Sequence, residues 1–195
     1  MAANPVTIKP NHHLKSMAMS DKYLVISALG KDRPGIVNTL SKAALDCGCN
    51  ITNSRMAVLG GEFALILLIS GSEAAVAAMQ KQLPALEEQL QLTIIAKTTA
   101  PRAAEQRWIP YRIQVVAMDH PGIVHPITDF FSAQKINIEE LETETYAAPH
   151  TGATMFSLQM TVAVPHSIPI SQLRETFIDF CDDLNLDASF EAARD

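Results

Sequence analysis

The sequence has few cysteines and no long hydrophobic run, which argues against a disulfide-stabilised protein and against a membrane-spanning one. Three cysteines in 195 residues are too few for a disulfide framework, which argues against an oxidising compartment. The longest apolar run, 63–69, is far shorter than the roughly 20 residues that span a bilayer. Residues 1–22 are polar, lack the apolar segment of a secretory signal and are expected to form a flexible tail. We therefore expect a cytoplasmic protein that does not act on membranes.

Positive charge is also scarce, because 15 Lys and Arg residues against 21 Asp and Glu give a net charge of −6. An acidic chain without a basic run does not attract phosphate backbones, so we expect no direct nucleic-acid binding. No nucleophile motif surrounds the serines, cysteines or histidines, and we expect no enzyme activity. Cys47 and Cys49 have no second pair of ligands nearby, so we also expect no metal site.

A repeat with an offset of 87 residues organises the chain. The motif at 32–37 recurs at 119–124, and Asn50-Ile51 recurs as Asn137-Ile138 without a gap. In both copies the apolar residues after the motif follow the spacing of one α-helical face. A chance match of one short motif would rarely preserve the helix face and the next strand as well. The chain therefore contains two related modules.

Each module predicts the order strand, helix, strand, strand, helix, strand. This is the ferredoxin-like βαββαβ arrangement, so we predict an α+β fold of two such domains, with antiparallel sheets and helices on one face. The predicted strands are 23–29, 51–58, 62–70 and 92–98 in the first module, and 111–117, 138–146, 156–164 and 186–190 in the second. The predicted organisation is a tail at 1–22, a first domain at 23–99, a linker at 100–110 and a second domain at 111–195.

Two prolines interrupt helical patterns. Pro126 falls in the first helix of the second module, where we expect a kink or an irregular start. Pro84 is expected to disturb the second helix of the first module. In the second module Glu140, Glu142 and Glu144 alternate along a strand, which predicts either a solvated face or a docking surface for a basic partner.

The turn between the first strand and the first helix offers both charges that a free amino acid needs. Unpaired N–H groups at a helix start attract a carboxylate, and Gly35 has no side chain to block the approach. Asp32 could receive an ammonium group, and Asn50, expected to begin the neighbouring strand, offers a donor and an acceptor. The alternative is purely structural, because Pro-Gly makes a good turn and Asp often caps it.

The motif Asp-Arg-Pro-Gly-Ile-Val at the end of a first strand resembles the ACT domain family, over residues 23–99 and 111–192. Segments 28–39, 47–51 and 54–57 further resemble the glycine cleavage system transcriptional repressors, a family with two ACT domains. The resemblance implies a non-enzymatic regulator that represses glycine cleavage genes through contact with a LysR-type activator protein. It also implies a small amino-acid effector such as glycine, no other cofactor, and a homodimer. A regulatory subunit of a metabolic enzyme is the alternative.

ACT domains commonly bind amino acids at this turn, at an interface between ACT units. The second module departs from the pattern at His120 and Pro126, so the first is the favoured sensor. Carried onto this sequence, the resemblance implicates Asp32, Arg33, Pro34, Gly35, Ile36, Val37, Asn50 and Ile51, and in the second module Asp119, His120, Pro121, Gly122, Ile123, Val124, Asn137 and Ile138.

Overall fold

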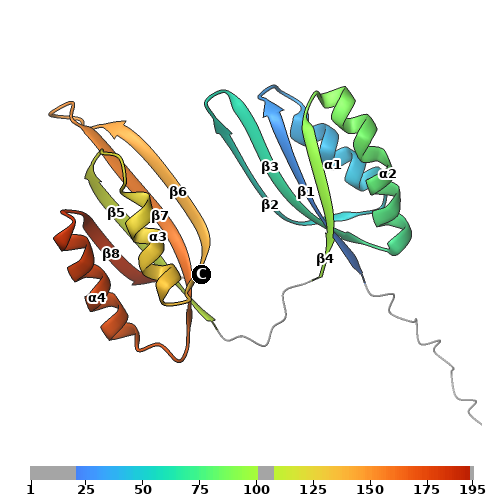
Figure 1. The fold of residues 1–195 in the computed structure, drawn as a ribbon. Helices are drawn as coiled ribbons and strands as arrows, with labels where there is room; N and C mark the ends of the chain where they lie inside the picture. Colours follow the sequence, from blue (N-terminus) through green and yellow to red (C-terminus); the bar gives the residue numbers. More distant parts are fainter. Residues whose placement is uncertain (1–20, 101–107, 194–195) are drawn as a thin grey trace, which may run out of the picture. The chain divides into compact units, whose positions relative to one another are not determined.

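The computed structural model describes residues 21–100 and 108–193, which form two compact units (Figure 1). Unit 1 lies within residues 1–102 and unit 2 within 103–195. The expected tail at 1–22 and linker at 100–110 fall mostly outside the described residues. Within those residues, no helix is long and apolar enough to cross a membrane.

Unit 1 has the predicted element order. Its antiparallel sheet has the strand order β2-β3-β1-β4. A connection through a helix joins β1 to β2, so these two strands run in the same direction with β3 between them. The elements are β1 (Lys22–Lys31), α1 (Ile36–Asp46), β2 (Asn50–Leu59), β3 (Glu62–Gly71), α2 (Glu73–Leu90) and β4 (Thr93–Thr99).

Unit 2 repeats this topology with the strand order β6-β7-β5-β8. The prediction of two tandem ferredoxin-like domains is therefore confirmed. Strand β5 begins at Trp108, three residues before the expected strand, because Trp108 to Pro110 still pair with β7. The elements are β5 (Trp108–Met118), α3 (Val124–Ala133), β6 (Asn137–Ala147), β7 (Thr154–Pro165), α4 (Ile170–Asp183) and β8 (Asp187–Ala192).

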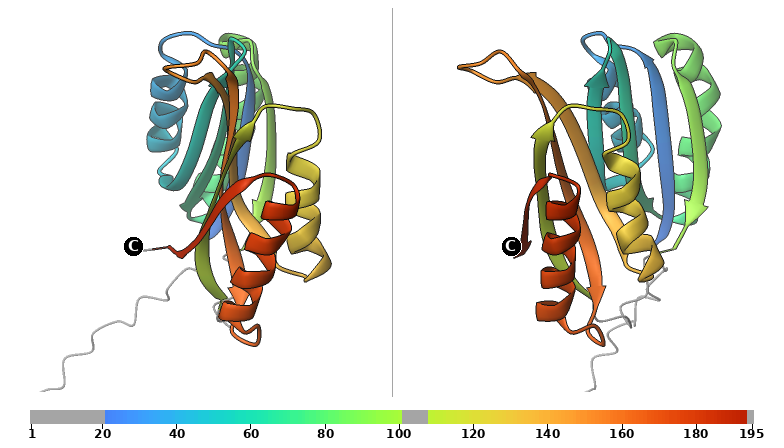
Figure 2. Two further views of the ribbon diagram at one scale, coloured as in Figure 1. Left: turned by 90° about the vertical axis from the view of Figure 1, so that its left-hand side faces the viewer. Right: turned by 60° about the vertical axis from the view of Figure 1, so that its left-hand side comes forward.

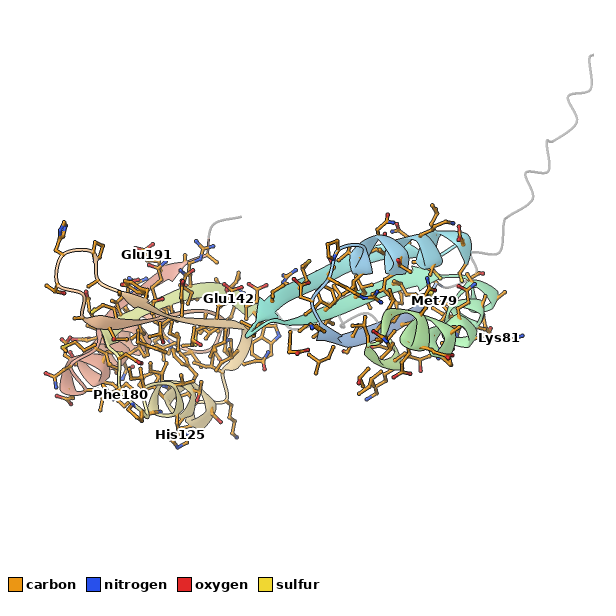
Figure 3. The ribbon with its side chains drawn as sticks, turned by 90° about the horizontal axis from the view of Figure 1, so that it is seen from above. Met79, Lys81, His125, Glu142, Phe180 and Glu191 are labelled. Atoms are coloured by element: carbon orange, nitrogen blue, oxygen red, sulfur yellow. The ribbon has the colours of Figure 1, made fainter. Side chains whose placement is uncertain are left out.

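Each unit buries its own core between one face of the sheet and the two helices. Alternate residues of β1 point into the core, as do the residues 87 positions later in β5. Leu24 thus corresponds to Tyr111, which is buried, whereas Tyr23 lies on the opposite face of its sheet. Unit 2 adds an aromatic cluster in which the Phe131 and Phe177 ring centroids lie 5.1 Å apart. The partly buried Phe180 of α4 belongs to this cluster and is labelled in Figure 3.

Both prolines are accommodated without breaking a helix. Helix α3 begins at Val124, so Pro126 occupies the first turn, where a missing N–H removes no helical hydrogen bond. The expected irregular start is confirmed: α1 begins at Ile36, whereas α3 begins at Val124, one residue after the counterpart of Ile36. Helix α2 continues through Pro84.

Candidate functional site

The candidate site in unit 1 is the turn at residues 32–37, which leads from β1 into α1. The N–H of Asp32 donates to the carbonyl of Gly61 at 3.2 Å, which ties the turn to the hairpin between β2 and β3. Gly35 caps α1 with a φ of 97°, a left-handed conformation that favours glycine. No side chain caps this helix. The helix start therefore presents N–H groups without a side-chain acceptor, which suits a carboxylate.

The space over Gly35 is open. A Cβ built at this glycine would meet no heavy atom within 4 Å beyond the two adjacent residues, and the same holds at Gly122, whose φ is also 97°. The carbonyl of Gly35 is already engaged, because it accepts hydrogen bonds from the N–H and the hydroxyl of Thr39, each at 2.9 Å. A ligand at the turn would therefore meet backbone donors rather than this carbonyl.

Arg33 has a structural partner outside the turn. Its Nη2 donates to the backbone carbonyl of Gln89 at 3.0 Å, in the last turn of α2. A cation at this position also offsets the negative end of the helix dipole. His120, the counterpart of Arg33 in unit 2, lies instead with Nδ1 at 3.1 Å from the carbonyl of Pro121. The turn of unit 1 is therefore linked to α2 by a side-chain hydrogen bond, whereas the contact of His120 stays within its own turn.

Burial separates the motif into packing and surface positions. Ile36 and its counterpart Ile123 are buried in the two cores, so their contribution is to anchor each turn. The remaining positions of both motifs are exposed: Asp32, Arg33, Pro34, Gly35 and Val37 in unit 1, and Asp119, His120, Pro121, Gly122 and Val124 in unit 2.

The structure does not bring the asparagines to the turns of their own units. Asn50 begins β2 and pairs with Ser70, whereas Lys31, just before Asp32, pairs with Glu62 at the other end of β3. Some nine residues at about 3.3 Å each place Asn50 roughly 30 Å from the turn. Asn137 likewise pairs with Ala163, far from the β5 end that precedes Asp119. Each asparagine begins a strand, as expected. That strand is not the immediate neighbour of β1 or β5, because β3 or β7 lies between them, and it starts at the opposite end of the sheet from the turn.

Two open depressions on the described surface lie away from the turns. One, of about 410 Å³, is lined by Asn137 and Ile138 together with Thr128 and Ser132 of α3 and Lys135, which follows α3. No pattern in the sequence marks Thr128, Ser132 or Lys135 as candidate site residues. The other, of about 590 Å³, lies between the starts of β1 and α2 and the end of β4. The openness of each turn rests instead on its exposed residues and on the free space over Gly35 and Gly122.

The cysteines are poor candidates for chemistry. Burial raises the pKa of the Cys47 thiol, with a further rise from the neighbouring Asp46 carboxylate, and burial also raises the pKa of Cys49. Both thiols are therefore protonated at neutral pH, the form that is neither nucleophile nor metal ligand. Among residues 21–100 and 108–193, no three His, Cys, Asp or Glu side chains form a metal-binding group.

Comparison with known proteins places the chain in a family. The ACT domain family matches residues 22–97. The glycine cleavage system transcriptional repressor of Escherichia coli (strain K12) is 38% identical over 170 residues, which cover 87% of this chain and 90% of that protein. A crystal structure of a protein provisionally described as a glycine cleavage system transcriptional repressor is 30% identical, with a TM-score of 0.67 over 90% of this chain and 99% of its own. A protein of unknown function from Galdieria sulphuraria is 31% identical, with a TM-score of 0.75 over 89% of this chain and 99% of its own. The chain therefore belongs to the family of glycine cleavage system transcriptional repressors, built from tandem ACT domains.

Proposed function

We propose that this protein is a non-enzymatic, amino-acid-responsive regulator in the cytoplasm that represses glycine cleavage genes through contact with an activator protein. The observation that carries the proposal is the similarity to the Escherichia coli repressor, which extends over both units. The net charge of −6 supports action through a protein rather than through DNA. An activator of the LysR type is the partner that the family resemblance favours.

We place the effector, a small amino acid such as glycine, at the turn between β1 and α1. The uncapped start of α1 suits its carboxylate, the exposed Asp32 suits its ammonium group, and Gly35 leaves room for both. We favour a small ligand because the groups at the turn that would hold it, the N–H groups at the start of α1 and the Asp32 carboxylate, lie close together in the chain. Where Asn50 or Asn137 contributes to such a site, a second ACT unit must supply it, because each lies at the far end of its own sheet.

The assignment of the ligand can be tested by calorimetry on two matched variants. Asp32→Asn removes the charge that receives the ammonium group, and we expect glycine affinity to fall about 10- to 100-fold, the size of a lost charge-assisted hydrogen bond. Asp119→Asn makes the same change at the equivalent position of unit 2 and should leave affinity unchanged. Equal effects of the two variants, or none, would contradict a sensor in unit 1.

The mode of repression can be tested with a glycine cleavage promoter in a reconstituted transcription assay. We expect this protein to repress only when the activator is present, and to cause no mobility shift of the promoter alone. A tight, salt-resistant shift with the pure protein would contradict the proposal. The alternative, a regulatory subunit of a metabolic enzyme, predicts instead that an amino acid changes the activity of a co-purifying enzyme.

A further inference from the structure

The negative charge of the chain is concentrated in unit 2. Residues 108–193 contain 12 Asp and Glu side chains but only 3 Lys and Arg, a net charge of −9, whereas residues 21–100 contain seven of each and are neutral. The two units share one topology, so this asymmetry is not a requirement of the fold. A field of one sign attracts partners of the opposite sign and accelerates their encounter. The charge of unit 2 therefore favours a basic partner.

Within residues 108–193, one side of the sheet has no helix over it. Helices α3 and α4 both pack on the other side, as Figure 2 shows. Ile113 of β5 points into the core, so Arg112 and Gln114 on either side of it point to the side without helices. We call this side the acidic face; the strand pairing assigns to it Arg112, Gln114 and Val116 of β5, Ser157, Gln159 and Thr161 of β7, Glu140, Glu142 and Glu144 of β6, and Asp187, Ser189 and Glu191 of β8.

Carboxylates lie along both edges of the acidic face. Glu142 and Glu144 are exposed on edge strand β6, and Asp187 and Glu191 are exposed on the opposite edge strand, β8. Glu142 and Glu191 are labelled in Figure 3. The two edge strands are three strand spacings apart, about 14 Å. Arg112 is the only basic side chain among the positions of this face. The face therefore offers separate acceptors for several guanidinium or ammonium groups.

The centre of the acidic face is uncharged but polar. Gln114 of β5 lies directly opposite Gln159 of β7, and Ser189 of β8 lies on the other side of Gln114. An apolar surface packed here would bury these groups without hydrogen-bond partners, which is costly. Arginine and lysine donate to amide oxygens as well as to carboxylates. The centre of the face thus suits the same basic partner as its edges.

Charge also disfavours two other occupants of the acidic face. The same face of a second copy would bring carboxylates against carboxylates, and a nucleic acid would bring phosphates. The size of the face suits a protein contact of the transient kind. Four strands about 4.8 Å apart, over three rows of side chains, give roughly 19 by 20 Å, so two partners together bury less than about 1,200 Å².

We propose that the acidic face of unit 2 is the surface through which this protein contacts its activator, and that it binds a surface of that protein on which arginine and lysine are clustered. The inference rests on the proposed function, because the activator is the partner named there. A contact between exposed charges is weakened by salt, since the screening length falls from about 10 Å at 0.1 M to about 3 Å at 1 M.

Binding of the full chain to the purified activator, measured by biolayer interferometry, tests the proposal. We expect the affinity of the unmodified chain to fall at least about 10-fold between about 0.05 and 0.5 M salt. Glu142→Lys combined with Asp187→Lys reverses one charge on each edge of the face. This double variant should bind at least about 10-fold more weakly at low salt and respond less to added salt.

Glu175→Lys combined with Asp179→Lys is the matched control. Both residues are exposed on α4, on the helix-covered side of the same unit, and the net charge changes by the same amount. This control should keep its affinity within about 3-fold, as expected for charges outside the contact. Circular dichroism checks that each variant is folded.

Three results would overturn the proposal, and they separate it from the proposed function. If the unmodified chain binds the activator and the variant of the acidic face binds equally well, the contact lies elsewhere and the regulatory function stands. If the control loses as much affinity as that variant, the overall charge of unit 2 matters and not this face. If the unmodified chain does not bind the activator at all, both the proposed mode of repression and this inference are wrong.

Discussion

The conformation of Gly35 predicts a measurable loss of stability when this residue is replaced by alanine. Its φ of 97° is unfavourable for any residue with a Cβ, and holding alanine there costs roughly 1–2 kcal/mol. Beyond the adjacent residues 34 and 36, no heavy atom lies within 4 Å of the position the new methyl would occupy, so the substitution adds no clash with the rest of the unit. We therefore expect Gly35→Ala to lower the free energy of unfolding of unit 1 by about 1–2 kcal/mol.

Hydrogen exchange followed by mass spectrometry can measure this loss in each unit separately, because each unit has its own core. The slowest amides of unit 1 should exchange about 5- to 30-fold faster in Gly35→Ala, while those of unit 2 remain unchanged. Gly122→Ala, at the same φ of 97°, should reverse this pattern. A change within the roughly 0.5 kcal/mol typical of surface substitutions would refute a turn held at positive φ. A loss well above about 3 kcal/mol would refute the open space over the turn.

Three further predictions concern the remaining contacts. Arg33→Ala removes the hydrogen bond to Gln89 and should destabilise unit 1 by about 0.5–1.5 kcal/mol in thermal unfolding; no change would mean that the bond contributes nothing in solution. Phe177→Ala empties a fully buried aromatic position and should cost about 3–5 kcal/mol in unit 2 alone, so a shift confined to unit 1 would contradict the packing. Burial raises the pKa of Cys181 from its usual 9.0 to about 12, with a smaller contribution from the Asp182 carboxylate. Because the folded state then holds a proton that the unfolded state releases, the stability from this thiol is complete below pH 9 and is lost between pH 9 and about 12; a urea titration across this range that shows no fall would contradict it.

Much of the fold could be predicted because the repeat constrains it twice. The 87-residue offset aligned two helix faces and two exit strands, and the alternation in β7 marked one buried face. Both signals are local patterns of hydrophobicity, and they are reliable because the apolar residues of each pattern must face the core of their unit. The start of α3 could not be predicted to the residue, because Pro126 is compatible with several positions in a first turn.

The candidate site was less predictable because its geometry is not local. The sequence predicts that Asn50 begins the neighbouring strand, and Asn50 does begin β2. A strand that follows a crossover helix starts at the far end of the sheet, however, so Asn50 lies away from the turn. The hydrogen bond from Arg33 to Gln89 joins residues 56 positions apart, and no pattern around either residue indicates it. The exposure of Asp32 and the open space at Gly35 likewise depend on how the turn leaves the sheet.

The most direct test of the central claim is a calorimetric titration of the unmodified chain with each of the common amino acids. The claim that this protein is an amino-acid sensor predicts saturable heat with a small amino acid such as glycine, and a rise in the melting temperature that follows its concentration. No heat and no thermal shift with any amino acid would contradict it.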